Sequence, residues 1–338
     1  MGIFKTLSAA IALVSISACG VNATQGVVKP PSQTSGPFGM ITHEEIKTEG
    51  DKAFSGVNKV VIGGFKVGFI TAKEEQEKAG SGIIGGRSSA ALEMQGLTPE
   101  VMQSITDKAY SDLLSKLKAQ GYEVVDRAEL TGSAEFSKAN HESSPLTEES
   151  SFFGSNNDVT YVAPKEIGKL YFFMGDSGPS GGFGFDNPTT AASTFADKTK
   201  LPVLSVVYTL DFASKNGSGG SFASTSALEV GQALSAIPGS GITLYGGSAG
   251  TFSTANGSLK LGQAITSPDT FGEIEMTTSD TMKVLETASN VAGVLLGAGS
   301  NQSRDFVLKA DPAKYSSGAS GVLSKANDDL LHSMKALR

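Results

Sequence analysis

Short runs of β-branched and aromatic residues recur along the chain and predict buried strands. The first is 59–70, where Gly63 and Gly64 indicate a bulge or a close packing contact midway. A second predicted strand is 169–174. A third, 201–212, alternates well, so that Leu204, Val206, Tyr208, Leu210 and Phe212 are expected to face the core.

One helix is signalled at both ends. Thr98 is a suitable N-cap, Pro99 fits the first helical position, and Gly121 is typical of a helix end. Its apolar residues recur at intervals of three and four and form one stripe: Met102, Ile105, Ala109, Leu113 and Leu117. A strand at 122–127 follows, so strand, helix and strand form a crossover unit whose two strands are expected to be parallel.

The region 201–276 predicts an antiparallel sheet. Asn216-Gly217 and Asn256-Gly257 are expected at hairpin turns. Three segments are interpreted as polar or glycine-rich connections: 73–96 as a hairpin loop or lid, 128–158 as a long excursion, and 175–192 as a loop.

Two amphipathic helices are expected near the C-terminus. The first begins at Ser279 or Asp280 and ends before Gly297; the second follows a strand at 306–308 and a turn at Asp311-Pro312. The apolar face of the second is formed by Leu323, Ala326, Leu330, Met334 and Leu337. The predicted class is a mixed α/β (α+β) fold, in which a β-α-β crossover unit joins an antiparallel sheet with two C-terminal helices. One globular domain spans 57–338, with possible sub-units 57–130 and 159–338.

The N-terminus has the pattern of a secretion signal. Lys5 precedes an apolar segment at 6–16 that is too short to span a membrane, and Ile16-Ser17-Ala18-Cys19 follows. These four residues resemble the lipobox of bacterial lipoproteins. The resemblance implies that 1–18 is a signal peptide, and that Cys19 receives a diacylglyceryl thioether and a third acyl chain. In enterobacterial lipoproteins, an Asp directly after the cysteine resembles a signal for retention in the inner membrane. This chain has Gly20 there, which favours the outer membrane. Two alternatives are a free thiol near an ordinary cleavage site and a buried cysteine of a cytosolic protein.

The segment 19–56 is predicted to be the lipidated N-terminus and a tether. Pro30, Pro31 and Pro37 lie among Gln, Ser, Thr and Gly, so 20–38 is expected to be a flexible coil. The pattern at 40–54 fits either a short helix or more tether.

The composition of the chain argues against several kinds of function. Formal net charge is −7, and removal of Lys5 with the signal peptide gives −7 − 1 = −8, which does not suit nucleic-acid binding. Cys19 is the single cysteine, so neither a disulfide framework nor a cysteine metal site is expected. The three histidines, His43, His141 and His332, are far apart in sequence. We therefore expect no metal and no cofactor.

A family resemblance covers about 70 residues. An aliphatic strand ending near a phenylalanine, a helix with spaced leucines and a second strand resemble the N-terminal α/β module of the curli-secretion lipoprotein CsgG and TolB-like proteins. The matching residues are Val60-Val61-Ile62 with Phe65, Leu113-Leu114-Leu117, and Gly121 through Arg127. The chain departs from the family in its long 73–96 insert and in lacking any clear pore-forming alternating hairpin. The resemblance thus implies a periplasmic, lipid-tethered scaffold, without a transport channel.

Two serines lie in motifs that resemble those of catalytic nucleophiles. Gly246-Gly247-Ser248-Ala249-Gly250 matches the G-x-S-x-G nucleophile elbow, and Asp269 and His332 follow in a suitable order. However, 251–257 is typical of strand and turn, and His332 falls within a predicted helix. Gly175-Asp176-Ser177-Gly178-Pro179 resembles a serine-protease motif but lacks one glycine. We assign no catalytic residue.

The sequence predicts a non-enzymatic scaffold or assembly component of the bacterial cell envelope. It is expected at the periplasmic face of the outer membrane, with the bilayer bound through acylated Cys19 and other envelope proteins as partners. One alternative is an envelope serine hydrolase that uses Ser248 or Ser177. The other is a small-ligand binding lipoprotein whose glycine-rich loops form a lid.

Overall fold

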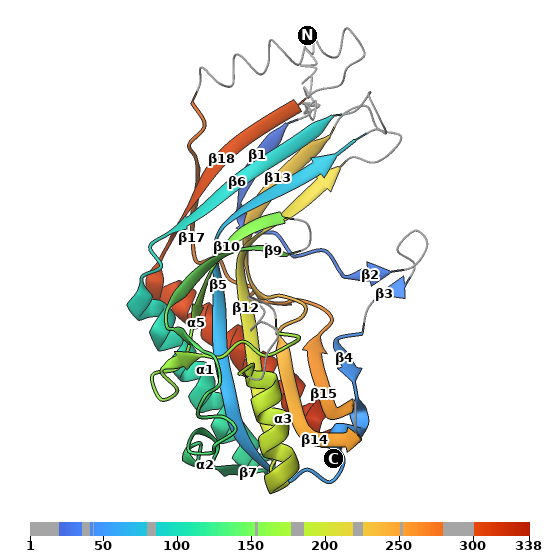
Figure 1. Cartoon of the computed structure of the whole chain (residues 1–338). Coiled ribbons are helices and arrows are strands. Elements are labelled where there is room, and N and C mark those ends of the chain that lie inside the picture. Colours follow the sequence, from blue (N-terminus) through green and yellow to red (C-terminus); the bar gives the residue numbers. More distant parts are fainter. Residues whose placement is uncertain are drawn as a thin grey trace, which may run out of the picture.

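A computed structural model describes residues 20–35, 41–42, 44–79, 86–152, 155–176, 186–218, 226–250, 253–279 and 301–338. It shows a mixed α+β fold built on a 14-stranded sheet, and four α-helices lie within these residues (Figure 1). The helices are α1 (Pro99–Ala119), α2 (Ala128–Thr131), α3 (Pro188–Thr199) and α5 (Pro312–Ala336). The predicted fold class is confirmed.

Two long strands form the centre of the sheet. They are β5 (Lys59–Lys78) and β12 (Val203–Ser218), and they pair in parallel from Val61–Val203 to Phe69–Leu210. The main path of the sheet is β17-β18-β6-β5-β12-β14-β15-β4. The other strands on this path are β17 (Gly272–Met276), β18 (Asn301–Ala310), β6 (Arg87–Gln95), β14 (Gly241–Gly250), β15 (Ser253–Leu261) and β4 (Ile46–Glu49).

Six further strands belong to the same sheet. They are β1 (Val21–Val27), β7 (Glu123–Val125), β9 (Leu146–Phe152), β10 (Ser155–Val162), β13 (Ala227–Ala236) and β16 (Ile265–Thr266). Two small pairs lie apart from it: β8 (Glu142–Ser143) with β11 (Lys169–Leu170), and β2 (Thr34–Ser35) with β3 (Ile41–Thr42). The short 3-10 helix η2 (Asp51–Phe54) precedes β5.

The central strands separate beyond Phe69 and Leu210. There β5 pairs with β6 from Ala72 to Lys78, whereas β12 pairs with β13 from Leu210 to Ser218. The result is two antiparallel hairpins that extend from a common base toward the end of the molecule away from α1 and α3 (Figure 1). The segment 73–96 was predicted as a hairpin loop or a lid. This is wrong, since much of it is strand and β6 alternates exposed and buried residues.

The glycines in β5 serve both predicted purposes. The register with β12 shifts by one residue between Ile62 and Gly64, so a bulge falls at Gly63. A Cβ at Gly64 would lie 2.9 Å from Cε2 of Phe173, too close for any real side chain, because that ring packs directly on the strand. The predicted bulge and close contact are both confirmed.

The helix α1 follows its sequence signals closely. The hydroxyl of Thr98 accepts a hydrogen bond from Val101 N at 3.4 Å, Pro99 is the first helical residue, and Gly121 has φ 87°. All five residues of the predicted apolar stripe are buried. After the helix, β7 pairs in parallel with the first residues of β5, which confirms the crossover unit; β6 lies between β5 and α1 in the chain.

The helix α5 covers one face of the sheet and packs on α1. Asp311 caps it, accepting from Ala313 N at 2.9 Å and Lys314 N at 3.0 Å, so the predicted Asp311-Pro312 turn is a helix start. Within α5, Asn327 links three elements: its amide accepts from the Tyr208 hydroxyl at 2.6 Å and donates to Ala109 O and to Asp112 of α1. The first of the two predicted C-terminal helices falls largely on 280–300, outside the described residues.

Other predicted connections contain regular structure. The polar excursion 128–158 holds α2, β8, β9 and the first half of β10. The loop 175–192 contains the start of α3, which Asn187 caps through a hydrogen bond from Thr189 N at 2.8 Å. Conversely, only Lys169–Leu170 of the predicted strand 169–174 is strand, although Tyr171, Phe172 and Phe173 are buried. These aromatic residues fill the core without joining the sheet.

Both Asn-Gly pairs lie inside strands, so the predicted turn positions are wrong. Asn216 and Gly217 pair with Glu229 and Leu228 of β13. Asn256 and Gly257 pair with Tyr245 and Leu244 of β14. The antiparallel sheet predicted for 201–276 is nevertheless present, although β12 also joins it in parallel to β5.

The predicted flexible tether is ordered over much of its length. Val21–Val27 form β1, which lies parallel to β13, so this segment is not a coil. Its Gln25 mimics a strand neighbour, because the side-chain amide donates to Ile274 O at 2.7 Å and accepts from Ile274 N at 3.0 Å in β17. Farther along, Gln33 and Gln263 exchange two hydrogen bonds of 2.9 and 3.0 Å. Backbone and amide bonding thus add to the burial of Val21 and Val28 in fixing this segment.

Candidate functional site

The predicted lipid-attachment residue, Cys19, lies outside the described residues. Gly20, the residue directly after it, is already part of the folded sheet: Leu228 N donates to Gly20 O at 3.0 Å, and Val21 pairs with Leu228. The described part of the chain is therefore bonded to β13 from its first residue, Gly20, onward.

The residues of the hydrolase alternative do not show the required geometry. The backbone of Gly246–Gly250 belongs to β14, and Ser248 pairs with Thr254 of β15. A nucleophile elbow requires a sharp turn between a strand and a helix, and β14 leads instead into another strand. Asp269 is exposed before β17, and His332 is exposed on α5.

The second serine motif is only partly described, because Ser177 lies outside the described residues. Its neighbour Asp176 has a structural role: the carboxylate forms an ion pair with Lys66 and accepts from Phe173 N at 3.1 Å. Lys66 also donates to Tyr171 O at 2.9 Å and is 1% exposed. His43 is outside the described part of the chain, and His141 is exposed beside the ring of Tyr171.

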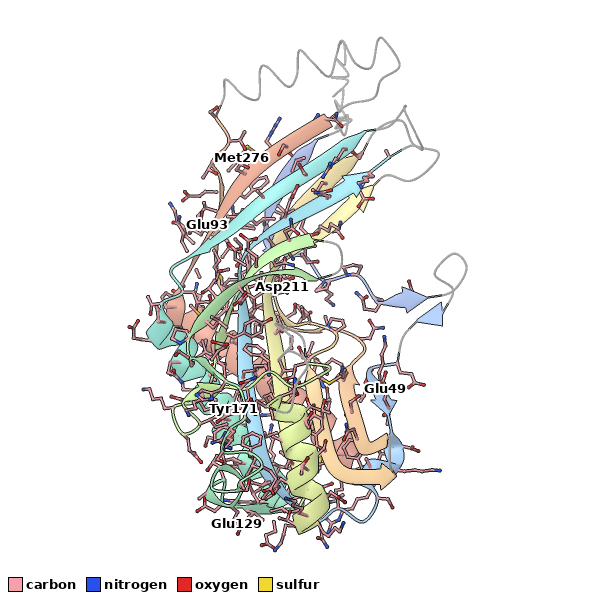
Figure 2. The ribbon with its side chains drawn as sticks, viewed as in Figure 1. Glu49, Glu93, Glu129, Tyr171, Asp211 and Met276 are labelled. Atoms are coloured by element: carbon pink, nitrogen blue, oxygen red, sulfur yellow. The ribbon has the colours of Figure 1, made fainter. Side chains whose placement is uncertain are left out.

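A different cluster of charged side chains lies where β5 and β12 separate. Lys73 Nζ is 2.7 Å from Glu75 Oε1 and 2.7 Å from Asp211 Oδ2. Lys215 Nζ is 3.5 Å from the other oxygen of Glu75 and 3.8 Å from Glu77 Oε2. Two ammonium groups therefore face three carboxylates; we call these five residues the fork cluster (Asp211 is labelled in Figure 2).

The fork cluster compensates for the loss of backbone pairing. Lys73 of β5 donates to Ala213 O of β12 at 2.9 Å, and Lys215 of β12 donates to Gln76 O of β5. Each strand thus satisfies a carbonyl of the other at the point where the ladder between them has ended, as buried carbonyls require. Asp211 Oδ1 also accepts from Phe212 N at 2.7 Å.

Burial and charge oppose each other at Lys73. Burial alone would lower the pKa of this ammonium, but the carboxylates of Asp211 and Glu75 act in the opposite direction and together prevail, so the pKa of Lys73 is raised. Lys73 therefore stays charged at neutral pH. A neutral amine in this position would leave two carboxylates without their main partner.

The fork cluster borders a cavity of about 170 Å³. We call it the fork cavity. Its apolar walls come from β5, β12, the segments after β1 and β13, and the residue before β16: Ile70, Ala213, Pro30, Pro31, Ile237, Pro238 and Ala264. Its polar lining includes Ser235, which is 1% exposed and whose Oγ has no hydrogen-bond partner within the described structure. Ser235 pairs with Asp211 across β12 and β13, so both side chains point to the same face.

Sequence reasoning missed the fork cavity. Lys73 and Glu75 were assigned to a loop, and Asp211 was placed on the strand face opposite the core, whereas that face is also covered. One signal was present, since an aspartate in the middle of a buried apolar strand requires a cationic partner. The identity of that partner depends on pairing between strands more than a hundred residues apart, which the sequence does not reveal.

The glycine-rich loops of the small-ligand alternative lie largely outside the described residues, which omit most of 80–86 and 178–184. Across the described helices, none is long and apolar enough to cross a bilayer. No cluster of three or more metal-binding side chains occurs within the described ranges. Comparisons with protein-family models, with curated proteins and with solved structures find no match to this chain.

Proposed function

We propose that this protein is a lipid-anchored, non-enzymatic scaffold or assembly component at the periplasmic face of a bacterial outer membrane. One observation carries the proposal: the residue after the lipobox-like cysteine is hydrogen-bonded into the sheet. An acyl anchor on Cys19 would therefore fix the orientation of the whole body at the bilayer, as a scaffold requires. The resemblance to the CsgG and TolB-like module supports the same role.

The edges of the sheet suit a scaffold. Within the described structure, β4 and β9 each pair with a single neighbour, so one side of each strand keeps backbone donors and acceptors for a partner. A partner protein could add a strand there, a mode in which main-chain hydrogen bonds supply affinity. We therefore expect partners that present extended segments.

The anchor is tested in the native host by mass spectrometry of Cys19. We expect a mature chain that begins at Cys19 and carries the mass of its acyl chains. Cys19→Ser should abolish acylation and move the protein out of the membrane fraction, because several acyl chains are needed for firm anchoring. Ser8→Ala, in the apolar leader outside the lipobox, is the control and should change neither. A bare thiol in the mature protein, or a retained leader, would overturn the proposal.

The scaffold role is tested by affinity purification from gently solubilised outer membranes. Other envelope proteins should co-purify with the native chain, and fewer with Cys19→Ser. A serine-directed activity probe separates this role from the hydrolase alternative. Covalent labelling of Ser248, lost in Ser248→Ala, would favour the hydrolase and contradict a non-enzymatic role.

A further inference from the structure

We propose that the side chains of Lys73 and Asp211 condense to an intramolecular amide, and that Glu75 carries the proton for this step. The inference is independent of the lipid anchor. It rests on the geometry of the fork cluster, in which one amine lies between two carboxylates and backbone amides hold one of these carboxylates. Leu210 is the last residue of β12 that pairs with β5, so the bond would join the two strands directly beyond the end of their ladder.

The two reacting groups are held together by the fold. Lys73 Nζ is 2.7 Å from Asp211 Oδ2, and it also donates to Ala213 O at 2.9 Å, so β12 fixes the amine from two sides. The side chains of Lys73 and Asp211 are only 5% and 15% exposed. Well-oriented intramolecular groups react as if at effective molarities of about 10⁵–10⁸ M. This proximity favours a condensation that a free amine and a free carboxylate do not undergo in water.

The carboxyl group of Asp211 is arranged as an acceptor for the amine. Its Oδ1 accepts from Phe212 N at 2.7 Å and from Ala213 N at 3.2 Å. Two backbone donors on one oxygen stabilise the oxyanion of a tetrahedral intermediate, which leaves Oδ2, beside Lys73, as the departing oxygen. Burial raises the pKa of Asp211 in spite of the opposing charge of Lys73. The protonated carboxyl, which is the form that an amine attacks, is therefore easier to reach than in an exposed aspartate.

Glu75 provides the path for the proton. Lys73 is charged at rest, so its ammonium must lose a proton before it can attack, and Glu75 Oε1, at 2.7 Å from Nζ, can accept it. The neutral amine then forms a bond to Cγ of Asp211, and the Cγ–Oδ2 bond breaks. Two protons leave the nitrogen, one of them through Glu75, and depart with Oδ2 as water. The ammonium and the carboxylate thus become one amide and one water molecule, and Glu75 is a carboxylate again.

The other deeply buried lysine offers an internal comparison. Lys66 forms an ion pair with Asp176, and within the described residues no second carboxylate pairs with it. The Asp176 oxygen that faces Lys66 is also the one that accepts from Phe173 N. Lys66 therefore has neither a proton carrier nor a carboxyl with one oxygen held by amides and the other facing the amine. We expect a link at Lys73 and none at Lys66.

The link is detected by mass spectrometry of the purified full chain. We expect a mass lower than that of the unlinked chain by one water molecule. After complete tryptic digestion, Val67–Lys78 should remain attached to Leu201–Lys215, because a linked Lys73 resists cleavage. Lys73→Arg keeps the positive charge but has no primary amine, so it should show the full mass and release the two peptides separately.

Two further variants separate the reaction from folding. Glu75→Gln still forms hydrogen bonds but cannot take the proton, so the link should form at least about 100-fold more slowly after cell-free synthesis. Glu77→Gln is the matched control: it removes the same charge from the fork cluster, but Glu77 pairs with Lys215 at 3.8 Å, so the link should form as in the native chain. Circular dichroism verifies that each variant is folded.

The native chain alone can refute the proposal. The full mass in folded native protein, with the two tryptic peptides separate, would overturn it. A linked Lys66, or a bond from Lys73 to Glu75 in place of Asp211, would contradict the assigned acceptor. Linking of Glu75→Gln at the native rate would overturn the role of Glu75 as proton carrier.

Discussion

Individual buried side chains with amide or amine groups link the strands of this sheet where their backbones do not pair. Gln232 of β13 is 1% exposed and makes four hydrogen bonds. Its carbonyl accepts from Phe271 N and Gly272 N, each at 2.9 Å, and its amide donates to Gly272 O at 2.8 Å and Gln25 O at 3.1 Å. One side chain thus joins β13 to β1 and β17.

Gln232→Ala should destabilise the protein by about 3 kcal/mol, since it would leave several buried backbone groups without partners. Urea unfolding followed by circular dichroism measures the change. Gln95→Ala is the control, because Gln95 is exposed at the end of β6 and its loss should change stability by less than about 0.5 kcal/mol. Similar midpoints for the two variants would contradict the linking role of Gln232.

The buried tyrosines predict a loss of stability at alkaline pH. Burial raises the pKa of Tyr110 to about 12 and also raises the pKa of Tyr161, Tyr208, Tyr245 and Tyr315. Above pH 10, the unfolded chain loses phenolic protons that the folded chain retains, so the free energy of unfolding falls as pH rises. Urea unfolding at pH 9, 10 and 11 should show this decline. At pH 11 the 295 nm phenolate absorbance should be small until urea unfolds the chain; full ionisation in the folded protein would refute the prediction.

At the scale of elements, helix caps combined with a helical stripe were a reliable signal, whereas pairing between distant strands could not be read from the sequence. The helix α1 was predicted from Thr98, Pro99 and a stripe of period 3.6, all of which act within one segment. The helix α3 was missed even though Asn187-Pro188 is the same kind of start signal, because the glycines before it dominated the interpretation. The strand β1 forms by pairing with β13, some two hundred residues away. Its polar sequence alone therefore led to the prediction of a flexible coil.

The two Asn-Gly pairs show why turn signals can mislead. In a hairpin such glycines supply positive φ, but here they make room for neighbouring groups. A Cβ at Gly257 would lie 2.5 Å from Cε2 of Phe54 and 2.8 Å from Gly50 O, and a Cβ at Gly217 would lie 2.5 Å from Glu77. The fork cavity was unpredictable for the same reason, since its residues meet only after β5, β12 and β13 have paired.

Gly257→Ala should therefore destabilise the protein by about 2 kcal/mol, because the backbone of Gly50 and the ring of Phe54 leave no room for a methyl group. Gly321→Ala is the matched control. A Cβ there meets nothing within 4 Å, and Gly321 lies inside α5, so alanine should stabilise by about 0.5–1 kcal/mol. Thermal or urea unfolding should show shifts of opposite sign; a neutral Gly257→Ala would mean that the η2–β15 contact relaxes freely.

On the scale of the whole molecule, the two ends of the long sheet hold different segments of the chain. One end holds η2, the start of β5 and the C-terminus, where Gly56 N donates to Arg338 O. The other end holds Gly20, the end of β5 at Lys78, and the starts of β6 and β18 at Arg87 and Asn301. Lys78 and Arg87 are direct cross-strand partners, a like-charge pair that anionic groups would stabilise.

The proposed anchor predicts which of these ends faces the bilayer. With Cys19 acylated, the end that holds Gly20 and Lys78 should lie at the headgroups, where lipid phosphates neutralise Lys78 and Arg87. The opposite end should remain in solution, because β5 has 20 residues and follows a path of about 60 Å at the usual rise per residue.

The sequence contains no tryptophan, so the fluorescence of a single introduced tryptophan reports how deeply that position lies in the bilayer. In acylated protein reconstituted into vesicles with brominated phospholipids, we expect strong quenching for Lys78→Trp and Asn301→Trp. We expect little quenching for Lys335→Trp, which is exposed on α5. Combining each substitution with Cys19→Ser should remove the quenching, since the acyl chains hold the protein at the membrane. Equal quenching of the three indoles would show that the sheet lies along the bilayer, which would contradict an upright scaffold held by its first strand.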